Sequence, residues 1–211
     1  MRKGALAVGL LASGFVPLLL GALFVHERSS GPTITRESAY RGNSPPGRIQ
    51  LPAFQLRSYR GDVVRTRELR GKVVLVTFLD TGCTTQCPII AAILGEAIRK
   101  LPAAARAKTV AFAISVDPQY DTPASVRRFL RRRNALGTFD FLLGTQKQLG
   151  PVWRSFYVLA VSKTANPNIH SADVRVFDPH GVWVSTLHVG VDLTAANLVH
   201  DVETALEEGR S

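Results

Sequence analysis

The chain has 211 residues, which is enough for one ordinary domain with appendages. Hydrophobic residues make up 45% and charged residues 20%, and these proportions exclude both wholesale disorder and a protein with several membrane spans. The two cysteines exclude a disulfide-rich scaffold and a four-cysteine zinc site, so they can build at most one metal or redox site.

The net charge is +10, from 26 Lys and Arg against 16 Asp and Glu. Such a balance is compatible with nucleic acid, anionic lipid or an acidic protein as partner. The densest basic run lies at residues 127–133, where Val126, Phe129 and Leu130 form an apolar stripe, so we interpret its arginines as the solvated side of a helix. Because no aromatic-interleaved basic motif or zinc-finger spacing is present, we expect no nucleic acid as partner.

The amino terminus predicts a membrane anchor over residues 1–28. Arg2 and Lys3 precede 22 uncharged residues, which as a helix would span roughly 30 Å, about one hydrocarbon core. The positive charges before the span should stay in the cytoplasm, which places the rest of the chain on the periplasmic side of the cell inner membrane. A cleaved signal peptide is the alternative, but cleavage at residues 12–14 would leave much of the apolar run on the mature chain.

Residues 29–47 are rich in Ser, Gly and Pro, which is typical of a linker. They precede a predicted soluble domain at residues 48–208, in which strands and helices alternate. Continuous β-branched runs predict strands buried on both faces, and apolar residues at helical spacing predict the helices. The predicted elements are strands at Lys72–Leu79 and Thr109–Val116, helices at Cys87–Leu101 and from Thr122, a hairpin of Val174–Phe177 with Val182–Leu187, and a helix from Thr194 to Leu206.

The order of these elements predicts a thioredoxin-like α/β domain, with a central mixed sheet flanked by helices. We expect an added N-terminal hairpin within residues 49–64. We also expect an insertion at residues 134–170, and a short helix near Leu149–Tyr157.

The chemistry is predicted where the first buried strand meets its helix, in the sequence TGCTTQCP. A four-residue spacing puts Cys83 and Cys87 on one side of the first helical turn, close enough to share a small ligand. The helix amino terminus stabilises negative charge, so at least one thiol should ionise more readily than a free cysteine. A purely structural disulfide is the alternative, but a loop of three intervening residues gains little stability from a cross-link.

Two thiolates under-coordinate most metals, so a third ligand should come from elsewhere in the chain. His170 is the candidate, because it lies just before the strand at Val174–Phe177 and that loop passes over the cysteines in a thioredoxin-like domain. We interpret the other histidines as surface or core residues and not as metal ligands. For Asp117 and Asp121 we favour turn and capping roles, and Asp80 either tunes the site or ends its strand.

An ordered set of motifs gives this chain its family resemblance, over about residues 40–208. The chain resembles the SCO/SenC family. The motifs that carry the resemblance are Tyr40-Arg41-Gly42, Leu51-Pro52-Ala53-Phe54, Leu69-Arg70-Gly71-Lys72, Cys83-Thr84-Thr85-Gln86-Cys87-Pro88, Ser115-Val116-Asp117-Pro118, Asp121-Thr122-Pro123, His170-Ser171 and Asp178-Pro179-His180-Gly181.

This resemblance implies a membrane-tethered domain that binds copper through Cys83, Cys87 and His170. It also implies a role in assembling the binuclear copper centre of cytochrome c oxidase, whose copper-centre subunit or another extracytoplasmic copper acceptor would be the partner. Thr84 departs from the proline that many members carry after the first cysteine, and the stretch before His170 is long. Soft thiolates with one imidazole suit Cu(I), and the nitrogen helps the site tolerate Cu(II).

Three functions remain open from the sequence, and the first is a metal carrier that is not an enzyme. The second is a thiol–disulfide oxidoreductase that reduces the cysteines of a copper acceptor, with Cys83 and Cys87 as the attacking and resolving sulfurs. The third is a peroxidase, which is disfavoured because Asp80 stands where that motif requires proline. A histidine in the loop opposite the cysteines favours metal binding.

Overall fold

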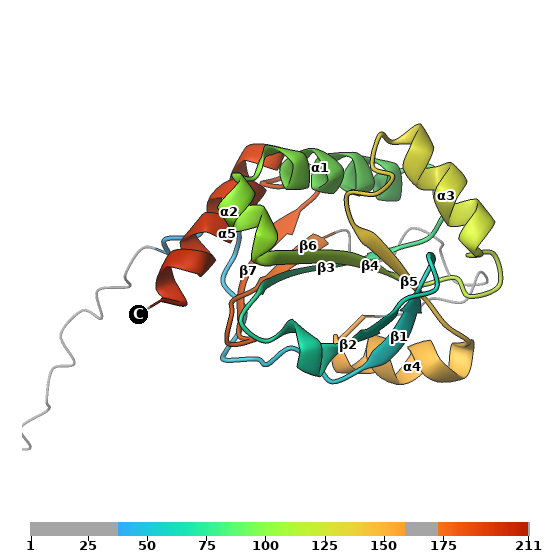
Figure 1. The fold of residues 1–211 in the computed structure, drawn as a ribbon, viewed down its shortest axis with the longest axis horizontal. Coiled ribbons are helices and arrows are strands. Elements are labelled where there is room, and N and C mark those ends of the chain that lie inside the picture. The colour runs from blue at the N-terminus through green and yellow to red at the C-terminus, as the bar shows by residue number, and fades with distance from the viewer. Residues whose placement is uncertain (1–37, 159–172, 211) are drawn as a thin grey trace, which may run out of the picture. The chain divides into compact units, whose positions relative to one another are not determined.

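The computed structural model describes residues 38–158 and 173–210, which contain a seven-stranded mixed sheet in the order β2-β1-β5-β4-β3-β6-β7 (Figure 1). The strands are β1 (Gln55–Ser58), β2 (Val63–Arg65), β3 (Val73–Leu79), β4 (Thr109–Ser115), β5 (Asp140–Leu143), β6 (Asp173–Phe177) and β7 (Trp183–His188). The helices are α1 (Gln86–Lys100), α2 (Ala103–Ala107), α3 (Pro123–Arg132), α4 (Gln146–Ser155) and α5 (Ala195–Glu208), with a short 3-10 helix η1 (Thr66–Leu69).

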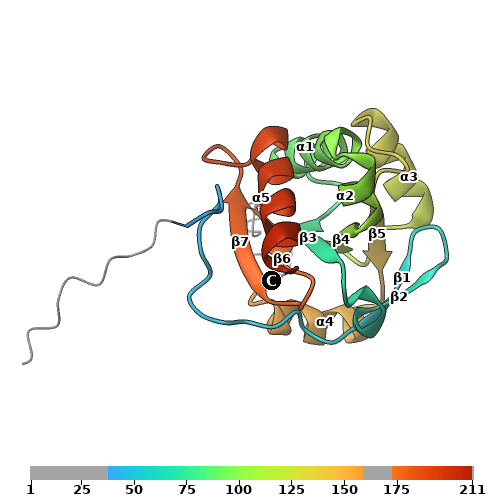
Figure 2. The same ribbon diagram turned by 60° about the vertical axis from the view of Figure 1, so that its left-hand side comes forward.

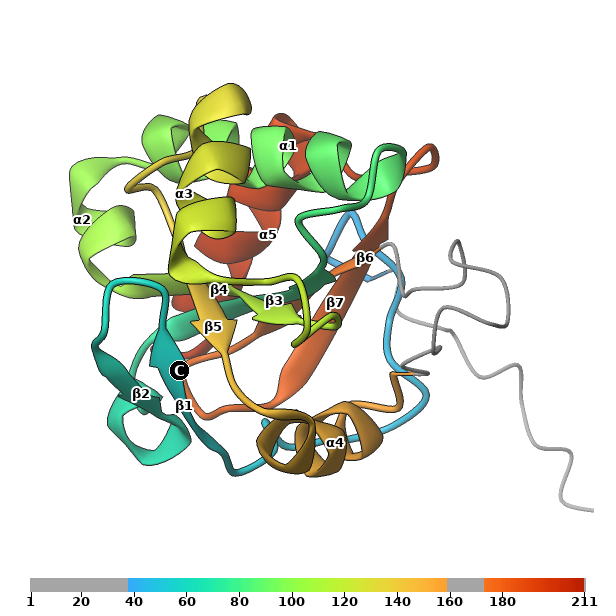
Figure 3. The same cartoon turned by 90° about the vertical axis from the view of Figure 1, so that its right-hand side faces the viewer.

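The central strand is β3, which pairs in parallel with β4 and antiparallel with β6. All seven of its residues are buried, because helices cover both faces of the sheet. Its odd-numbered apolar residues, from Val73 to Leu79, pack into a core with α1, α2, α3 and α5, whereas Val74, Val76 and Phe78 pack toward α4 and η1. Figures 1 and 3 show these two helical layers on opposite faces. This arrangement confirms the predicted thioredoxin-like α/β fold.

The segment 134–170 differs from its prediction, because it contributes the strand β5. This strand pairs in parallel with β4 and antiparallel with β1, so it joins the N-terminal hairpin of β1 and β2 to the rest of the sheet. Phe141 and Leu142 bury their side chains in the two different cores. A strand of four residues is too short for a hydrophobic pattern in the sequence to predict it, and it is stabilised by pairing with the strands β1 and β4.

Local signals explain where the helices begin. The side chains of Thr122, Thr145 and Thr194 each accept a hydrogen bond from the backbone N–H three residues later, which caps α3, α4 and α5. Pro123 at the first position of α3 and the cap of α5 were both predicted. In α4, Gln148 completes a capping box with Thr145, so this helix begins earlier than the predicted Leu149.

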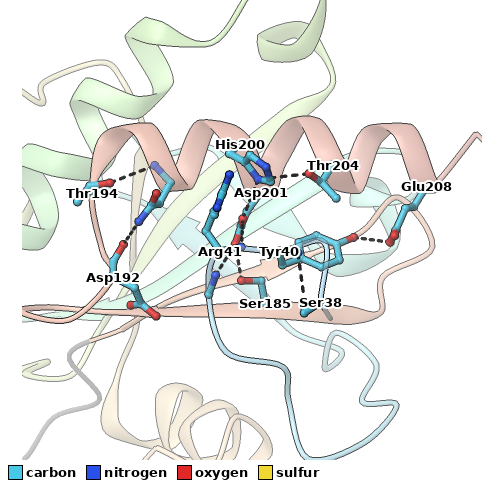
Figure 4. A network of polar contacts seen from close by, with 12 residues as sticks. Ser38, Tyr40, Arg41, Ser185, Asp192, Thr194, His200, Asp201, Thr204 and Glu208 are labelled. Carbon is cyan, nitrogen blue, oxygen red and sulfur yellow. Dashed lines mark hydrogen bonds and ion pairs between the residues drawn. The ribbon is translucent and has the colours of Figure 1, made fainter. Parts of the chain in front are cut away.

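A cluster of hydrogen bonds attaches the first described residues to β7 and α5 (Figure 4). The fully buried carboxylate of Asp201 accepts hydrogen bonds from the backbone N–H groups of Arg41 and Gly42 and from the hydroxyl of Ser185. Asn43 then forms a bridge with Thr186, and the chain continues along β7 (Figure 2). Contacts with the sheet therefore begin within residues 29–47, the predicted linker.

Two predictions lie outside the described residues. The membrane anchor was predicted at residues 1–28, and within residues 38–158 and 173–210 no helix is long and apolar enough to cross a membrane. The proposed third ligand, His170, lies in the undescribed stretch 159–172.

Candidate metal centre

The site is built where β3 and β4 end at the same edge of the sheet. The backbone N–H of Val116 donates to the carbonyl of Leu79 at 3.1 Å, which holds the ends of these parallel strands together. The loop of residues 80–85 leaves β3 at this edge and leads directly into α1. Sheets of this kind place their ligand sites at the carboxyl ends of the strands, so the position agrees with the sequence prediction.

The structure brings the two cysteines together in unequal environments. Cys83 lies in the loop and is partly exposed, whereas Cys87 is the second residue of α1 and only 3% exposed. Both are free thiols, and their side chains form a hydrogen bond with each other. The hydroxyl of Thr85 lies 3.6 Å from the sulfur of Cys83.

These contacts shift the pKa values of the two thiols in opposite directions. The hydrogen bond from Cys87 is the largest effect on Cys83 and lowers its pKa to about 4, with further help from the backbone N–H groups of Cys87 and Thr85. The same hydrogen bond and burial raise the pKa of Cys87. Cys83 is therefore the thiolate of the pair, and Cys87 is the protonated donor.

Two aspartates hold the loop that carries Cys83. The carboxylate of Asp80 accepts hydrogen bonds from the backbone N–H groups of Gly82 and Cys83, the latter at 3.0 Å. Burial raises the pKa of Asp80. Asp121 lies beneath the loop, where its carboxylate accepts from the backbone N–H of Thr81 at 2.9 Å and the hydroxyl of Ser115 at 2.6 Å.

The predicted capping role therefore does not describe Asp121, because Thr122 is the residue that caps α3. Asp121 is a buried cross-link between two loops, and its pKa is raised to about 6, mainly by burial. Asp117 agrees better with the predicted turn role, since its carboxylate accepts a hydrogen bond from the backbone N–H of Gln119. The Asp121 contacts were not predicted from the sequence, where the only signal for them was the Asp121-Thr122-Pro123 motif.

The described residues supply two of the three predicted ligands. Within residues 38–158 and 173–210 no group of three or more His, Cys, Asp and Glu side chains could hold a metal ion. His180 lies in the turn between β6 and β7, His188 ends β7, and His200 lies on α5 beside Asp201. The chemistry of this part of the site is thus that of a thiolate paired with a thiol.

A cavity of about 670 Å³ opens beside Cys83. We refer to it as the arginine cleft, because three arginines line it on the α3 side: Arg128, Arg132 and Arg133. The loop side is formed by Cys83 and its neighbours, and α3 forms the opposite side. The arginines are exposed, as the sequence predicted, but they face the same cavity as the reactive sulfur.

The fold and the cysteine pair define a thioredoxin-like protein with a C-x-x-x-C site. A family model described as SCO1/SenC matches residues 43–207, so the chain belongs to the SCO1/SenC family.

Individual relatives agree with this assignment. The chain is 26% identical over 166 residues to the SCO1 protein homolog of Bacillus subtilis (strain 168), which covers 76% of this chain and 84% of that protein. Among solved structures, ScoI of Bradyrhizobium japonicum with copper bound is 28% identical, with a TM-score of 0.63 over 75% of this chain and 99% of that one. The apo Sco1 protein of Thermus thermophilus is 25% identical, with a TM-score of 0.65 over 78% and 96% of the two chains.

Proposed function

We propose that this protein binds copper through Cys83, Cys87 and His170 and delivers it to, or prepares, the binuclear copper centre of cytochrome c oxidase. The observation that carries the proposal is the pair of reduced sulfurs at the start of α1, one partly exposed and already acidic. The ScoI structure of B. japonicum, 28% identical, was solved with copper bound, which supports the choice of metal.

The register of β6 supports His170 as the third ligand. β6 runs antiparallel to β3, with Val174 opposite Thr77, so β6 begins at the edge of the sheet where β3 ends and the cysteine loop starts. His170 precedes the first residue of β6 by three positions. Three extended residues span at most about 10 Å, so the length of the chain allows the imidazole to reach that edge.

The chemistry of the ligand set suits a carrier. Thiolates are soft ligands that select Cu(I), and one imidazole gives the site tolerance for Cu(II). A three-ligand site with one partly exposed sulfur leaves room for an acceptor to take the metal by ligand exchange, which a closed four-ligand cage would hinder.

A competition titration tests the proposal. The reduced full chain in detergent should bind one Cu(I) against a chelator of known affinity, and Cys83→Ala or Cys87→Ala should bind it much more weakly, because each variant loses one of the two thiolates. His170→Ala should weaken it by at least about tenfold. The control is His180→Ala, which changes a histidine in a hairpin turn and should leave the affinity unchanged. Equal affinities for His170→Ala and the unmodified chain would contradict the ligand set.

A second function is favoured by one specific observation, the unequal acidity of the two sulfurs. A thiol–disulfide reductase needs an exposed thiolate to attack and a second thiol to resolve the mixed disulfide, and Cys83 and Cys87 have these properties. A disulfide switch has been identified in the Sco protein BsSco, whose structure is 25% identical to this chain. Exchange needs no imidazole, so His170→Ala should spare it while weakening copper binding.

A further inference from the structure

We propose that the arginine cleft is the docking surface for an acidic segment of the protein that exchanges copper or thiols with Cys83. The arginines of α3 would bind carboxylates on either side of the partner's own cysteine. This inference rests on one part of the proposed function, namely that Cys83 is the residue whose sulfur contacts the partner.

The geometry places the positive charges beside the reactive sulfur. Arg128, Arg132 and Arg133 form the α3 side of the cleft, and Cys83, Thr84 and Thr85 lie on its loop side. A volume of about 670 Å³ is large enough for several side chains of an extended segment. A partner cysteine that reaches Cys83 therefore brings its flanking residues against α3.

The side chains of these arginines are available to bind a partner. Within the described part of the chain, no hydrogen bond or ion pair engages the guanidinium group of Arg128, Arg132 or Arg133. Arg127 differs, because it stacks over the ring of Tyr59 and donates to the carbonyl of that residue. The cleft thus holds unengaged guanidinium groups, which bind carboxylates in a bidentate manner.

Among the described residues, the acidic side chains of the cleft form no ion pair with these arginines. The carboxylate of Asp80 accepts from the backbone of Gly82 and Cys83, and that of Asp117 accepts from the backbone of Gln119. Two of the arginines, at positions 128 and 132, are four residues apart on one helix face, where like charges repel each other. Such an arrangement costs stability, and an anionic partner would relieve the repulsion.

The extent of the surface favours a protein segment over a small anion. The exposed basic face continues along α3 beyond the cleft to Arg131, and the exposed ring of Tyr120 lies at the cleft itself. Arginine and tyrosine are enriched at protein interfaces. The chain as a whole carries a net charge of +10, so an acidic partner would also be attracted at longer range.

The test compares disulfide peptides that differ only in charge. The probes are acetyl-Glu-Glu-Cys-Glu-Glu amide, its Gln counterpart and its Lys counterpart, each joined through its sulfur to 2-thiopyridine. The Cys83 thiolate attacks the peptide sulfur, which forms a protein–peptide disulfide and releases 2-thiopyridone. Cys87 then loses its proton and displaces the peptide thiolate, so the protein dithiol is oxidised to a disulfide and the probe disulfide is reduced.

The reduced full chain in detergent at low ionic strength should react with the Glu peptide about tenfold faster than with the Lys peptide, since electrostatic steering changes association rates on this scale. Added salt should shrink this preference. The variant Arg128→Glu/Arg132→Glu/Arg133→Glu should abolish or reverse it, and the milder triple change to Gln should give an intermediate value. The matched control is Arg70→Glu/Arg106→Glu/Lys108→Glu, which makes the same change in charge at exposed positions near the opposite ends of β3 and β4 and should keep the preference.

A preference that survives in both α3 variants, or that falls equally in the control, would overturn the proposal. A preference for oxidised glutathione over neutral disulfides, with no discrimination among the peptides, would also overturn it in favour of a small-anion site. Cu(I) binding by each variant separates this result from the proposed function. The α3 variants should still bind one Cu(I), whereas failure of the copper proposal would appear as normal copper binding by Cys83→Ala.

Discussion

Asp121 accepts a hydrogen bond of 2.9 Å from the backbone N–H of Thr81, and this contact joins the segment before α3 to the loop that carries Cys83. The same carboxylate accepts from the hydroxyl of Ser115 at the end of β4. One buried side chain thus fixes the position of the cysteine loop relative to two neighbouring elements. A metal site that depends on three ligands needs this kind of support, because its geometry is set by the groups that hold the ligands.

The burial of Asp121 predicts a pH dependence of stability. Its pKa is raised from 3.8 to about 6, so the folded protein keeps a proton that the unfolded chain loses earlier. The stability from this group is fully present below pH 3.8 and is lost as the pH rises through about 6. Relative to Asp121→Asn, the unmodified chain should lose up to about 3 kcal/mol of unfolding free energy across that window.

Urea unfolding at several pH values, followed by tryptophan fluorescence, measures this difference. Trp153 is a suitable probe, because it is buried and its indole N–H donates to the carbonyl of Ser115. The exposed Asp62 supplies the control for the substitution itself, and Asp62→Asn should leave the free energy of unfolding at neutral pH close to that of the unmodified chain. A stability difference between the unmodified chain and Asp121→Asn that stays constant with pH would contradict the prediction.

The hydrogen bond between the cysteines predicts the alkylation behaviour of Cys83. Its pKa of about 4 means that Cys83 should react with iodoacetamide well below neutral pH, while the buried Cys87 remains unmodified. Cys87→Ala removes the main hydrogen-bond donor, so the midpoint of the rate profile should rise, whereas Cys87→Ser keeps a donor and should shift it less. Mass spectrometry of the labelled chain identifies the modified residue. An unchanged midpoint in Cys87→Ala would show that this hydrogen bond does not set the acidity.

Asp80 is predicted to act on copper binding through the loop backbone. Asp80→Ala leaves the N–H groups of Gly82 and Cys83 without their carboxylate acceptor, so the position of the Cys83 sulfur should become less defined. We expect a loss of about tenfold in Cu(I) affinity, the scale seen for groups that support a ligand. Asp80→Asn keeps an acceptor oxygen and should restore most of the affinity. If both variants bind Cu(I) as the unmodified chain does, Asp80 has no part in the site.

Gly42 is predicted to tolerate no side chain. A Cβ atom at this position would lie 2.3 Å from the hydroxyl oxygen of Ser185 and 2.6 Å from the backbone oxygen of Thr186. Gly42→Ala should therefore destabilise the domain by about 1–3 kcal/mol, the cost of forcing atoms into packed structure. Gly47→Ala is the matched control, because nothing lies within 4 Å of its added carbon. Thermal unfolding of the two variants measures the effect, and equal melting temperatures would contradict it.

The amino-terminal sequence predicts how the protein is attached to the cell. Residues 1–28 should anchor the chain, so it should stay in the membrane fraction after a carbonate wash and be digested by protease added to spheroplasts. Replacing Arg2 and Lys3 with Glu should impair this orientation, since both positive charges that precede the apolar span are then lost. Recovery of the full-length chain in the soluble cytoplasm would exclude the anchor.

Patterns of neighbouring residues in the sequence predicted the central elements β3 and α1. The features that were not predicted depend on contacts between residues far apart in the chain. The β-branched run of β3 and the helical spacing in α1 depend on neighbouring residues, so the sequence indicates both elements and the cysteines between them. The strand β5 has four residues and exists because β1 and β4 flank it. Asp121 and Asp201 bond to groups 40 and 160 positions away, which no spacing rule could indicate.

The arginines of α3 also show that the sequence predicts local features of the site but not its tertiary contacts. Their exposure followed from the apolar stripe on the other side of the helix. Their position beside Cys83 depends on how α3 packs next to α1, and this is a property of the tertiary structure.

X-ray absorption at the copper edge, on the reduced full chain loaded with one Cu(I), identifies and counts the atoms that bind copper. We expect two sulfur ligands and one nitrogen, with the nitrogen lost in His170→Ala and one sulfur lost in Cys83→Ala. A copper shell without sulfur, or one that is the same in all three proteins, would contradict the claim that Cys83, Cys87 and His170 hold the metal.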